Sequence, residues 1–205
     1  MIKNIIFDFG DIFIDLDKQA VLNALKNNNI MEFLPKYLAL NNDFEVGKID
    51  SDEFLFGLKA DFQHLSNAQI AEIWNSMLLD FPAYRLDYIE DLARSKKYRL
   101  FLLSNTNALH IPHVAKIMGT ERYTRFRNCF ERFYLSHEIR LRKPDREVYQ
   151  FVLDQNKLSA PETLFIDDTR ENTEAAAALG IHTWNLQVGK EDVIQLREKL
   201  KSYGL

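Results

Sequence analysis

Four groups of polar residues, spaced widely along the chain, have the side chains that phosphoryl chemistry needs. They are Asp8, Ser104, Lys143 and the adjacent pair Asp167 and Asp168. In an open parallel α/β sheet, ligands bind in the crevice beyond the carboxyl ends of the strands. Because each group follows an expected strand, we predict that all four converge on one pocket at that edge of the sheet.

Each group suits one task in the transfer of a phosphoryl group. A carboxylate at the end of a buried strand can attack phosphorus and form an aspartyl-phosphate, which makes Asp8 the candidate nucleophile. Its approach to a phosphate dianion meets charge repulsion, so a divalent cation has to bridge the two, and hard oxygen ligands suit Mg²⁺. Ser104 and the backbone N–H of Asn105 can donate to phosphoryl oxygens, and Lys143 can neutralise the reacting groups.

Each feature has a plainer interpretation when it is taken alone. A strand-end aspartate is usually a turn or capping residue, Ser-Asn usually marks a loop, and Lys-Pro usually begins a helix. Adjacent carboxylates are usually a solvated helix cap, but Asp167 and Asp168 directly follow a buried-strand pattern. The presence of all four groups in one chain favours the functional interpretation.

Strands and helices alternate in the two parts of the chain that hold these residues. Short runs of apolar, β-branched and aromatic residues predict strands over 2–7, 100–103, 133–135, 164–166 and, at an edge, 182–186. Helices are expected from about Ala108, from near Pro144, over 171–179 with Gly180 as terminator, and over 193–200. This alternation predicts an α/β fold with a three-layer, Rossmann-like core around a parallel sheet.

Between residues 17 and 87 the pattern changes to helical periodicity alone. Apolar residues recur at helical spacing there, and Ser51 and Ser66 stand where helix starts are expected. We expect a small helical-bundle domain over 17–87, inserted into a core domain over 1–16 and 88–205. A chain of 205 residues is long enough for both, because one domain typically takes ~100–150 residues.

Composition and charge indicate an ordinary globular protein with a small partner. Apolar residues make up 46% of the chain and charged residues 27%. A formal net charge of −4 gives no field that would attract nucleic acid or an anionic membrane surface. Cys129 is the only cysteine, and neither a signal peptide nor an apolar run of membrane length is evident. We therefore expect a cytoplasmic monomer or homodimer.

Three local features have both a plain and a functional interpretation. The segment from Arg122 to Arg146 is basic, which indicates a solvated face of arginines or an anion-attracting rim beside the pocket. His110 and His113 follow the Ser104 group, where a substrate could approach, although a surface or capping role is the plainer assignment. Cys129 lacks a Cys-His arrangement and is expected to be a partly buried, unreactive thiol.

The polar groups belong to four motifs in a fixed order: 8–12 (Asp-Phe-Gly-Asp-Ile), 104–107 (Ser-Asn-Thr-Asn), 142–145 (Arg-Lys-Pro-Asp) and 165–168 (Phe-Ile-Asp-Asp). In this order they resemble the four motifs of the haloacid dehalogenase-like (HAD) hydrolase superfamily. The resemblance covers the whole chain, because that family places a helical C1-type cap after its first motif. It is closest to the phosphatase subgroup that includes bacterial α-glucose-1-phosphatases and the N-terminal domain of soluble epoxide hydrolases.

The resemblance implies a Mg²⁺-dependent phosphomonoesterase that acts on a small phosphorylated metabolite, such as a sugar phosphate. The metal ligands that it implies are Asp8, the backbone carbonyl of Gly10, and Asp168. Asp167 would orient the metal shell or pair with Lys143, and Asn172 would hold a metal-bound water. The turn over 44–49 resembles one that faces the active site in relatives, although a plain helix-helix turn is as good an explanation.

Gly10 departs from the pattern of the family. Phosphatases of the superfamily usually carry a second aspartate at this place, two residues after the nucleophile, as general acid and base. Such assistance is worth ~10²–10⁴-fold, so its loss predicts slow turnover and a preference for leaving groups that need little protonation. Asp11 could substitute only if the turn brings it round, and Asp15 and Asp17 are expected to be turn and helix-start residues.

Three rival functions use similar residues. A haloacid dehalogenase also lacks the second aspartate, but it needs no metal and would leave Asp167 and Asp168 without a purpose. A phosphate-sensing protein that barely turns over is compatible with Gly10. A response-regulator receiver shares the chemical groups, but its single short domain has no place for the helical stretch over 17–87.

Overall fold

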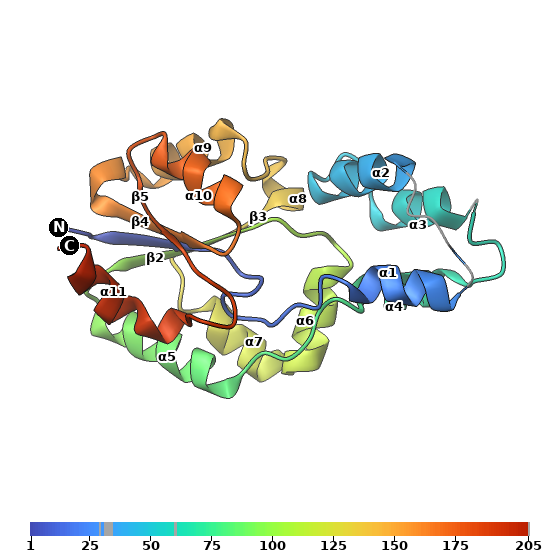
Figure 1. Ribbon diagram of the computed structural model, residues 1–205, viewed down its shortest axis with the longest axis horizontal. Coiled ribbons are helices and arrows are strands. Elements are labelled where there is room, and N and C mark those ends of the chain that lie inside the picture. Colours follow the sequence, from blue (N-terminus) through green and yellow to red (C-terminus); the bar gives the residue numbers. More distant parts are fainter. Residues whose placement is uncertain (29, 31–34, 60, 205) are drawn as a thin grey trace.

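Five parallel strands form the centre of the protein, in the order β3-β2-β1-β4-β5 (Figure 1). They are β1 (Asn4–Phe7), β2 (Arg99–Ser104), β3 (Arg132–Leu135), β4 (Thr163–Asp167) and β5 (His182–Asn185). The computed structural model describes residues 1–28, 30, 35–59 and 61–204. It confirms the predicted α/β class and all the predicted strands, with β5 at an edge.

The register of the sheet places the carboxyl ends of three strands together. Phe7 at the end of β1 pairs with Leu102 of β2 on one side and with Ile166 of β4 on the other. Asp8 lies one residue beyond β1, while Ser104 and Asp167 are the last residues of β2 and β4. These polar residues therefore reach the same edge of the sheet, as the sequence predicts.

Helices cover both faces of the sheet, because successive residues of a strand point to opposite sides. Ile5 and Phe7 pack into the cluster on one face, and Ile6 packs into the cluster on the other. The first face is covered by α5 (Ala83–Ser95), α6 (His110–Met118), α7 (Thr120–Arg127) and α11 (Leu196–Ser202) (Figure 1). The second face is covered by α8 (Ser136–Ile139), α9 (Arg146–Asn156) and α10 (Arg170–Ala177).

Aromatic rings anchor the loop that follows β1. Phe9 stacks on Phe126 with 5.4 Å between ring centroids, and Phe13 meets the edge of the same ring at 5.0 Å. Phe130 packs against Phe126 as well, also at 5.0 Å. Asp8 thus lies between two buried phenylalanines, Phe7 and Phe9, which fix its backbone at the edge of the sheet.

The insert consists of two helix pairs with their own apolar core. Its helices are α1 (Ala20–Asn27), α2 (Pro35–Glu45), α3 (Ser51–Lys59) and α4 (Asn67–Asn75). Helix α1 contacts α4, and α2 contacts α3. Phe54 joins the pairs, because it stacks on Phe44 at 4.3 Å and meets Trp74 at 4.8 Å. The predicted helix starts at Ser51 and Ser66 are confirmed, and Ser66 caps α4 with a capping box.

Some boundaries differ from those expected. The predicted end of the insert at residue 87 falls inside α5, whose Leu86 and Ile89 pack into the core cluster beside the sheet. Helix α9 begins at Arg146, after Asp145 as N-cap, and not at Pro144. The closing segment is a 3₁₀ turn (Val193–Gln195) that leads into α11, and another 3₁₀ turn (Ala160–Glu162) precedes β4. The parts of the predicted insert at 29, 31–34 and 60 lie outside the described residues.

Among the described residues, no helix combines the length and the apolar character that crossing a membrane would require.

Candidate active site

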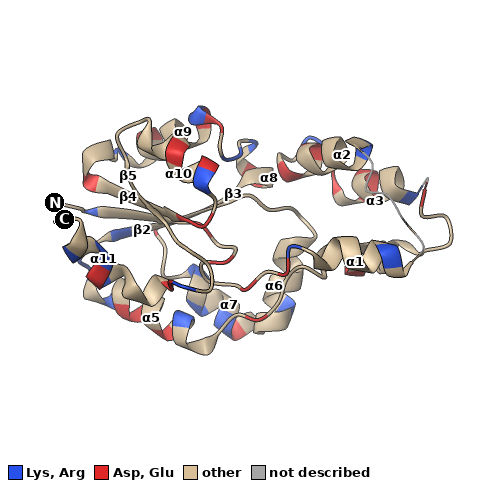
Figure 2. Cartoon of the chain, in the orientation of Figure 1, with Lys and Arg blue, Asp and Glu red and all other residues tan. Residues whose placement is uncertain are grey.

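A crevice of about 390 Å³ lies at the carboxyl edge of the sheet, where the core faces the insert. Figure 2 shows acidic residues on the loops that leave this edge. The crevice is lined by residues that the sequence singled out, namely Asp8, Gly10, Ser104, Asn105, Lys143, Asp168 and Asn172. Asp167 is buried directly behind them. The predicted convergence of the four motifs is therefore a feature of the fold.

The floor of the crevice is an ion-pair triad around Lys143. The Nζ atom of Lys143 lies 2.6 Å from Asp8 Oδ1 and 2.7 Å from Asp167 Oδ2. Lys143 retains only 1% of its exposure and Asp167 none. Such a buried charge is tolerable only when it is paired and hydrogen-bonded. Lys143 therefore fixes the position of Asp8 through a short, charge-assisted contact.

Two carboxylates share one ammonium in this triad, which leaves an excess of negative charge. Burial raises the pKa of Asp8 to about 7; the charge of Lys143 opposes this rise and that of Asp167 adds to it. Burial disfavours the charge of Lys143 too, but Asp167 and Asp8 outweigh it and hold the pKa of Lys143 above its ordinary value. The site is therefore electrostatically suited to take up a cation.

Asp167 is held in place from several directions. Asn172 Nδ2 donates to both carboxylate oxygens, at 3.1 and 3.0 Å, and the backbone N–H of Thr169 donates to Oδ1 at 2.8 Å. With Lys143 on Oδ2, these partners engage both oxygens of Asp167. Of the two roles that the resemblance implies for this residue, the structure shows the pairing with Lys143.

The donor set at the edge of the crevice fits Mg²⁺. Asp8, Asp167 and Asp168 each offer a carboxylate oxygen, and these oxygens lie within 4.8 Å of one another. Asp8 and Asp168 line the crevice, whereas Asp167 does not and is already engaged by its neighbours. Asp8 and Asp168 are therefore the carboxylates of this set that can reach an ion in the crevice. Hard anionic oxygens around an excess of negative charge are what Mg²⁺ prefers. Gly10 also lines the crevice, and its carbonyl stays a predicted ligand.

Asn105 has a structural task that sequence reasoning missed. Its side-chain Nδ2 donates to the Lys143 carbonyl oxygen at 2.8 Å, and its Oδ1 accepts from the Lys143 N–H at 2.9 Å. This pair of hydrogen bonds joins the loop after β2 to the segment that carries the buried lysine. Ser104, 3% exposed, lies beside it at the crevice. The residues predicted to bind phosphate therefore form one connected unit.

Asp11 does not turn toward the crevice. It has a positive φ of 56°, its Oδ1 accepts from the Leu16 N–H at 3.1 Å, and its Oδ2 lies 2.8 Å from Lys18 Nζ. Asp17 accepts from the Gln19 N–H just before α1, as expected of a helix-start residue. Asp15 is not in a turn as predicted; it lies between the bridge residues Ile14 and Leu16 and pairs with Arg85. Asp11 is not among the described residues that line the crevice, so it does not replace the missing aspartate at position 10.

Lys18 is a second cation at the crevice, and the sequence did not single it out. Its Nζ lies 2.6 Å from Asp168 Oδ2 and 2.8 Å from Asp11 Oδ2. Partial burial opposes its charge, but the hydrogen bonds to Asp11 and Asp168 raise the pKa of Lys18 above the ordinary range. Lys18 lies in the turn before α1 rather than directly after a strand, so no motif marked it.

The two histidines take structural roles. The Nε2 atom of His110 lies 3.3 Å from the Trp74 carbonyl oxygen, and burial lowers the pKa of His110 to about 4. His113 is half-buried on α6 and does not line the crevice. Burial also raises the pKa of the Cys129 thiol to about 11, which agrees with the predicted unreactive cysteine.

Each of the two interpretations of the basic segment fits some of its arginines. Arg125 pairs with Glu90 on the surface, as expected of a solvated face. Arg142 instead lines the crevice and contacts Glu45 of the insert, so the turn over 44–49 reaches the edge of the site.

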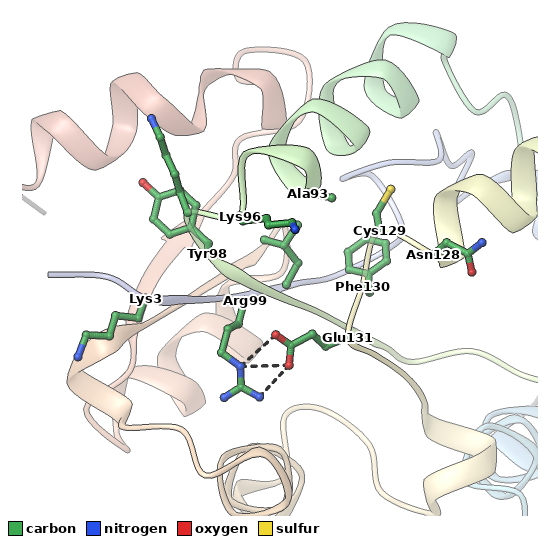
Figure 3. Close-up of a pocket in the computed structure, with 11 residues that line it drawn as sticks. Lys3, Ala93, Lys96, Tyr98, Arg99, Asn128, Cys129, Phe130 and Glu131 are labelled. Atoms are coloured by element: carbon green, nitrogen blue, oxygen red, sulfur yellow. Dashed lines mark hydrogen bonds and ion pairs between the residues drawn. The ribbon is translucent and has the colours of Figure 1, made fainter.

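A larger cavity of about 610 Å³ lies at the opposite, amino-terminal end of the strands (Figure 3). Arg99 on its wall pairs with Glu131 at 2.8 Å, and Lys3 pairs with Glu162. Its lining holds neither a carboxylate cluster nor any residue of the four motifs. We therefore assign the chemistry to the smaller crevice at the carboxyl edge.

Comparison with known proteins identifies the family. A model of the haloacid dehalogenase-like hydrolases matches residues 2–180. The chain belongs to this family. D-ribitol-5-phosphate phosphatase from Bacteroides thetaiotaomicron is 28% identical over 198 residues, which cover 93% of this chain and 95% of that protein. Full-length similarity to this enzyme and the four motifs place the chain among the HAD phosphatases.

Solved structures agree with this assignment. A HAD-family enzyme from Bacteroides thetaiotaomicron, solved as a magnesium complex, has a TM-score of 0.81 and 33% identity, covering 93% of this chain and 96% of that chain. The same enzyme was also solved with magnesium and inorganic phosphate, with a TM-score of 0.77. A HAD-like hydrolase from Porphyromonas gingivalis has a TM-score of 0.82 and 28% identity, covering 98% of both chains.

The raised pKa of Asp8 predicts that Mg²⁺ binding depends on pH. Below a pKa of about 7 Asp8 holds a proton that a metal ion has to displace, so affinity rises with pH and levels off above about 7. The rise amounts to at most ~10-fold per pH unit. The affinity for Mg²⁺ is measured by isothermal titration calorimetry at pH values below and above this pKa. Asp8→Asn is the control and should remove the pH dependence; an equal slope in both proteins would contradict the assignment.

Proposed function

We propose that this hydrolase cleaves small phosphate monoesters with the help of Mg²⁺, through a phospho-enzyme formed on Asp8. The observation that carries this proposal is the contact of 2.6 Å between the buried Lys143 Nζ and Asp8 Oδ1 at the floor of the crevice. It places a carboxylate and a cation together where a phosphoryl group can enter.

In the first step, the Asp8 carboxylate attacks phosphorus and the bond between phosphorus and the ester oxygen breaks. Lys143 neutralises part of the charge, while Ser104 and the backbone N–H of Asn105 donate to the phosphoryl oxygens. The leaving oxygen takes its proton from solvent, because position 10 offers no side chain. In the second step, water attacks phosphorus, releases inorganic phosphate and regenerates the Asp8 carboxylate.

Asp8, the Gly10 carbonyl and Asp168 are the proposed metal ligands, and the ion, when bound, reduces repulsion between the carboxylate and the phosphate. Asp167 holds Lys143 at its buried position, and Asn172 in turn orients Asp167. The proposed role of Asn172 toward a metal-bound water is compatible with its place at the crevice.

We propose a sugar or polyol phosphate as the substrate. A crevice of about 390 Å³ suits a small molecule, and Lys18 and Arg142 on its wall provide charged hydrogen-bond donors for an anionic, hydroxyl-rich compound. One relative, the Bacteroides thetaiotaomicron phosphatase, is named for D-ribitol 5-phosphate, which belongs to this class. A cytoplasmic location and a monomeric or homodimeric state are part of the same proposal, and the single, partly buried cysteine is compatible with a reducing compartment.

A weakly active phosphate-binding protein is the second candidate. It is favoured by Gly10 together with Asp11, whose carboxylate is held by Leu16 and Lys18 instead of facing the crevice. Such a protein would bind Mg²⁺ and phosphate in the same place but hydrolyse esters slowly.

The function is tested by phosphate release from a panel of esters with and without Mg²⁺. The panel comprises sugar and polyol phosphates and an aryl phosphate. We expect Mg²⁺-dependent release, and we expect Asp8→Asn to reduce it to the background rate because the nucleophile is gone. Near-normal activity of Asp8→Asn would contradict the assigned role. Bound Mg²⁺ without release from any ester would favour the phosphate-binding protein.

Gly10→Asp tests the cost of the missing acid. A Cβ atom at position 10 would lie 2.7 Å from Leu16 Cδ1, the flexible end of a side chain, so Leu16 has to shift. We expect the rate on alkyl phosphates to rise at least ~10-fold relative to the rate on the aryl phosphate, since only the former need protonation. Gly10→Ala makes the same steric demand without a carboxyl group and should leave the ratio unchanged. Equal ratios in the two variants would contradict this explanation.

A further inference from the structure

The insert is joined to the core on one side by two chain segments that lie against each other. The Asp17 N–H donates to the Met77 carbonyl at 2.9 Å, and Leu16 forms an antiparallel bridge with Leu78. The Leu79 N–H donates to the Asp15 carbonyl, also at 2.9 Å. The two segments therefore form a short ribbon, which is a natural axis for movement of the insert.

The insert also touches the core at a second place, away from this ribbon. The end of α2 contacts α8, and Figure 1 shows these helices on the side of the crevice opposite to α1, α4 and α6. The insert is therefore joined to the core by the chain itself on one side of the crevice, and it only touches the core non-covalently on the other side. Such a contact can control how far the insert opens.

Glu45 and Arg142 form the charged part of this contact. Arg142 Nη2 lies 3.0 Å from Glu45 Oε2, and Arg142 Nη1 donates to Asn42 Oδ1 at 2.8 Å. The Glu45 side chain is 19% exposed and that of Arg142 30%. Asn41 Nδ2 donates to the other Glu45 oxygen at 3.1 Å, which orients the carboxylate within the insert. The attraction within such a partly buried pair is screened less by water and salt than that within a pair on the open surface.

Gly47 brings the backbones of the two parts together. Its φ is +63°, and a Cβ atom built there would lie 2.1 Å from the His137 carbonyl oxygen of α8. A side chain at this position would force the turn away from α8. Gly47 thus provides both the backbone conformation and the close approach that the contact needs.

Both core elements of the contact are tied to the residues proposed to bind phosphate. Arg142 directly precedes Lys143, whose backbone N–H and carbonyl both hydrogen-bond with the Asn105 side chain. In α8, Ser136 Oγ accepts from the Thr106 N–H and donates to the Thr106 carbonyl, both at 2.9 Å. The insert therefore rests on the same loops that would hold the phosphoryl group.

We propose that Glu45 and Arg142 are positioning residues whose ion pair, completed by Asn42 and Gly47, docks the insert over the crevice. This inference rests on the proposed function for its effect on the substrate. With the pair intact, the insert covers the bound ester; without it, the insert rotates more freely about the ribbon and the ester dissociates faster. Arg142 also lines the crevice, so Glu45, which does not, is the residue whose replacement reports on docking alone.

Docking itself is tested by hydrogen–deuterium exchange of the metal-free protein, without any turnover. The variants are Glu45→Ala, Arg142→Ala and the double variant. We expect each single variant to speed exchange in the last turn of α2 and in α8 roughly fivefold to tenfold, and the double variant to add little. Gly47→Ala, which separates the backbones, should give the same pattern. Unchanged exchange in the single variants, or additive effects in the double variant, would overturn the docking contact.

Lys48→Ala is the matched control. Lys48 pairs with Asp43 at 3.0 Å close to Glu45, but both partners belong to the insert and are exposed. Its loss should leave exchange in α8 unchanged. An effect as large as that of Glu45→Ala would mean that any charge change near this turn loosens it.

The effect on the substrate is measured as KM and kcat on the best ester of the panel. Glu45→Ala should raise KM roughly fivefold or more with a much smaller change in kcat, and Glu45→Gln, which keeps the shape and loses the charge, should follow it. A loss in kcat alone would contradict a positioning role. If no ester is hydrolysed, the proposed function fails, whereas the exchange experiment still decides whether the pair docks the insert.

Discussion

The core is organised around a buried cation that has to keep its partners. Lys143 is almost completely removed from water, and its Nζ lies within 2.7 Å of one oxygen each of Asp8 and Asp167. Loss of one partner from a buried ion pair costs ~3–5 kcal/mol, because a charge is left without compensation. Neighbouring strands β1 and β4 supply the two carboxylates, and Asn105 at the end of β2 holds the backbone of the lysine. The triad therefore forms only because β2, β1 and β4 are neighbours in the sheet.

The same triad explains why the site needs a further cation. One ammonium between two carboxylates leaves negative charge at the crevice. Burial raises the pKa of Asp8, and the charge of Asp167 adds to this rise while that of Lys143 opposes it. Lys18 offsets part of this charge on the side of Asp168. The protein therefore holds its candidate nucleophile and the proposed phosphate-binding groups in place by itself, and the remaining charge is what a divalent ion would balance.

The sequence predicted the residues that follow strands, and it could not predict the contacts between distant segments. Asp8, Ser104 and Asp167 were foreseeable because parallel strands end at one edge of a sheet. Three contacts join segments that are far apart in the chain and therefore leave no local sequence pattern. They are the hydrogen bonds between Asn105 and the Lys143 backbone, the ion pair of Lys18 with Asp168, and the ion pair of Glu45 with Arg142. Helical periodicity also fails to distinguish an insert from a core helix, which is why the expected boundary fell inside α5.

The central claim is that Asp8 carries the phosphoryl group. The most direct test is rapid quenching of the enzyme during turnover of its best ester, followed by borohydride reduction, which converts an aspartyl-phosphate to homoserine, and by mass spectrometry of the peptides. The account predicts homoserine at position 8, dependent on Mg²⁺ and on substrate. Turnover with an unmodified Asp8, or with the phosphoryl group on Ser104, would contradict it.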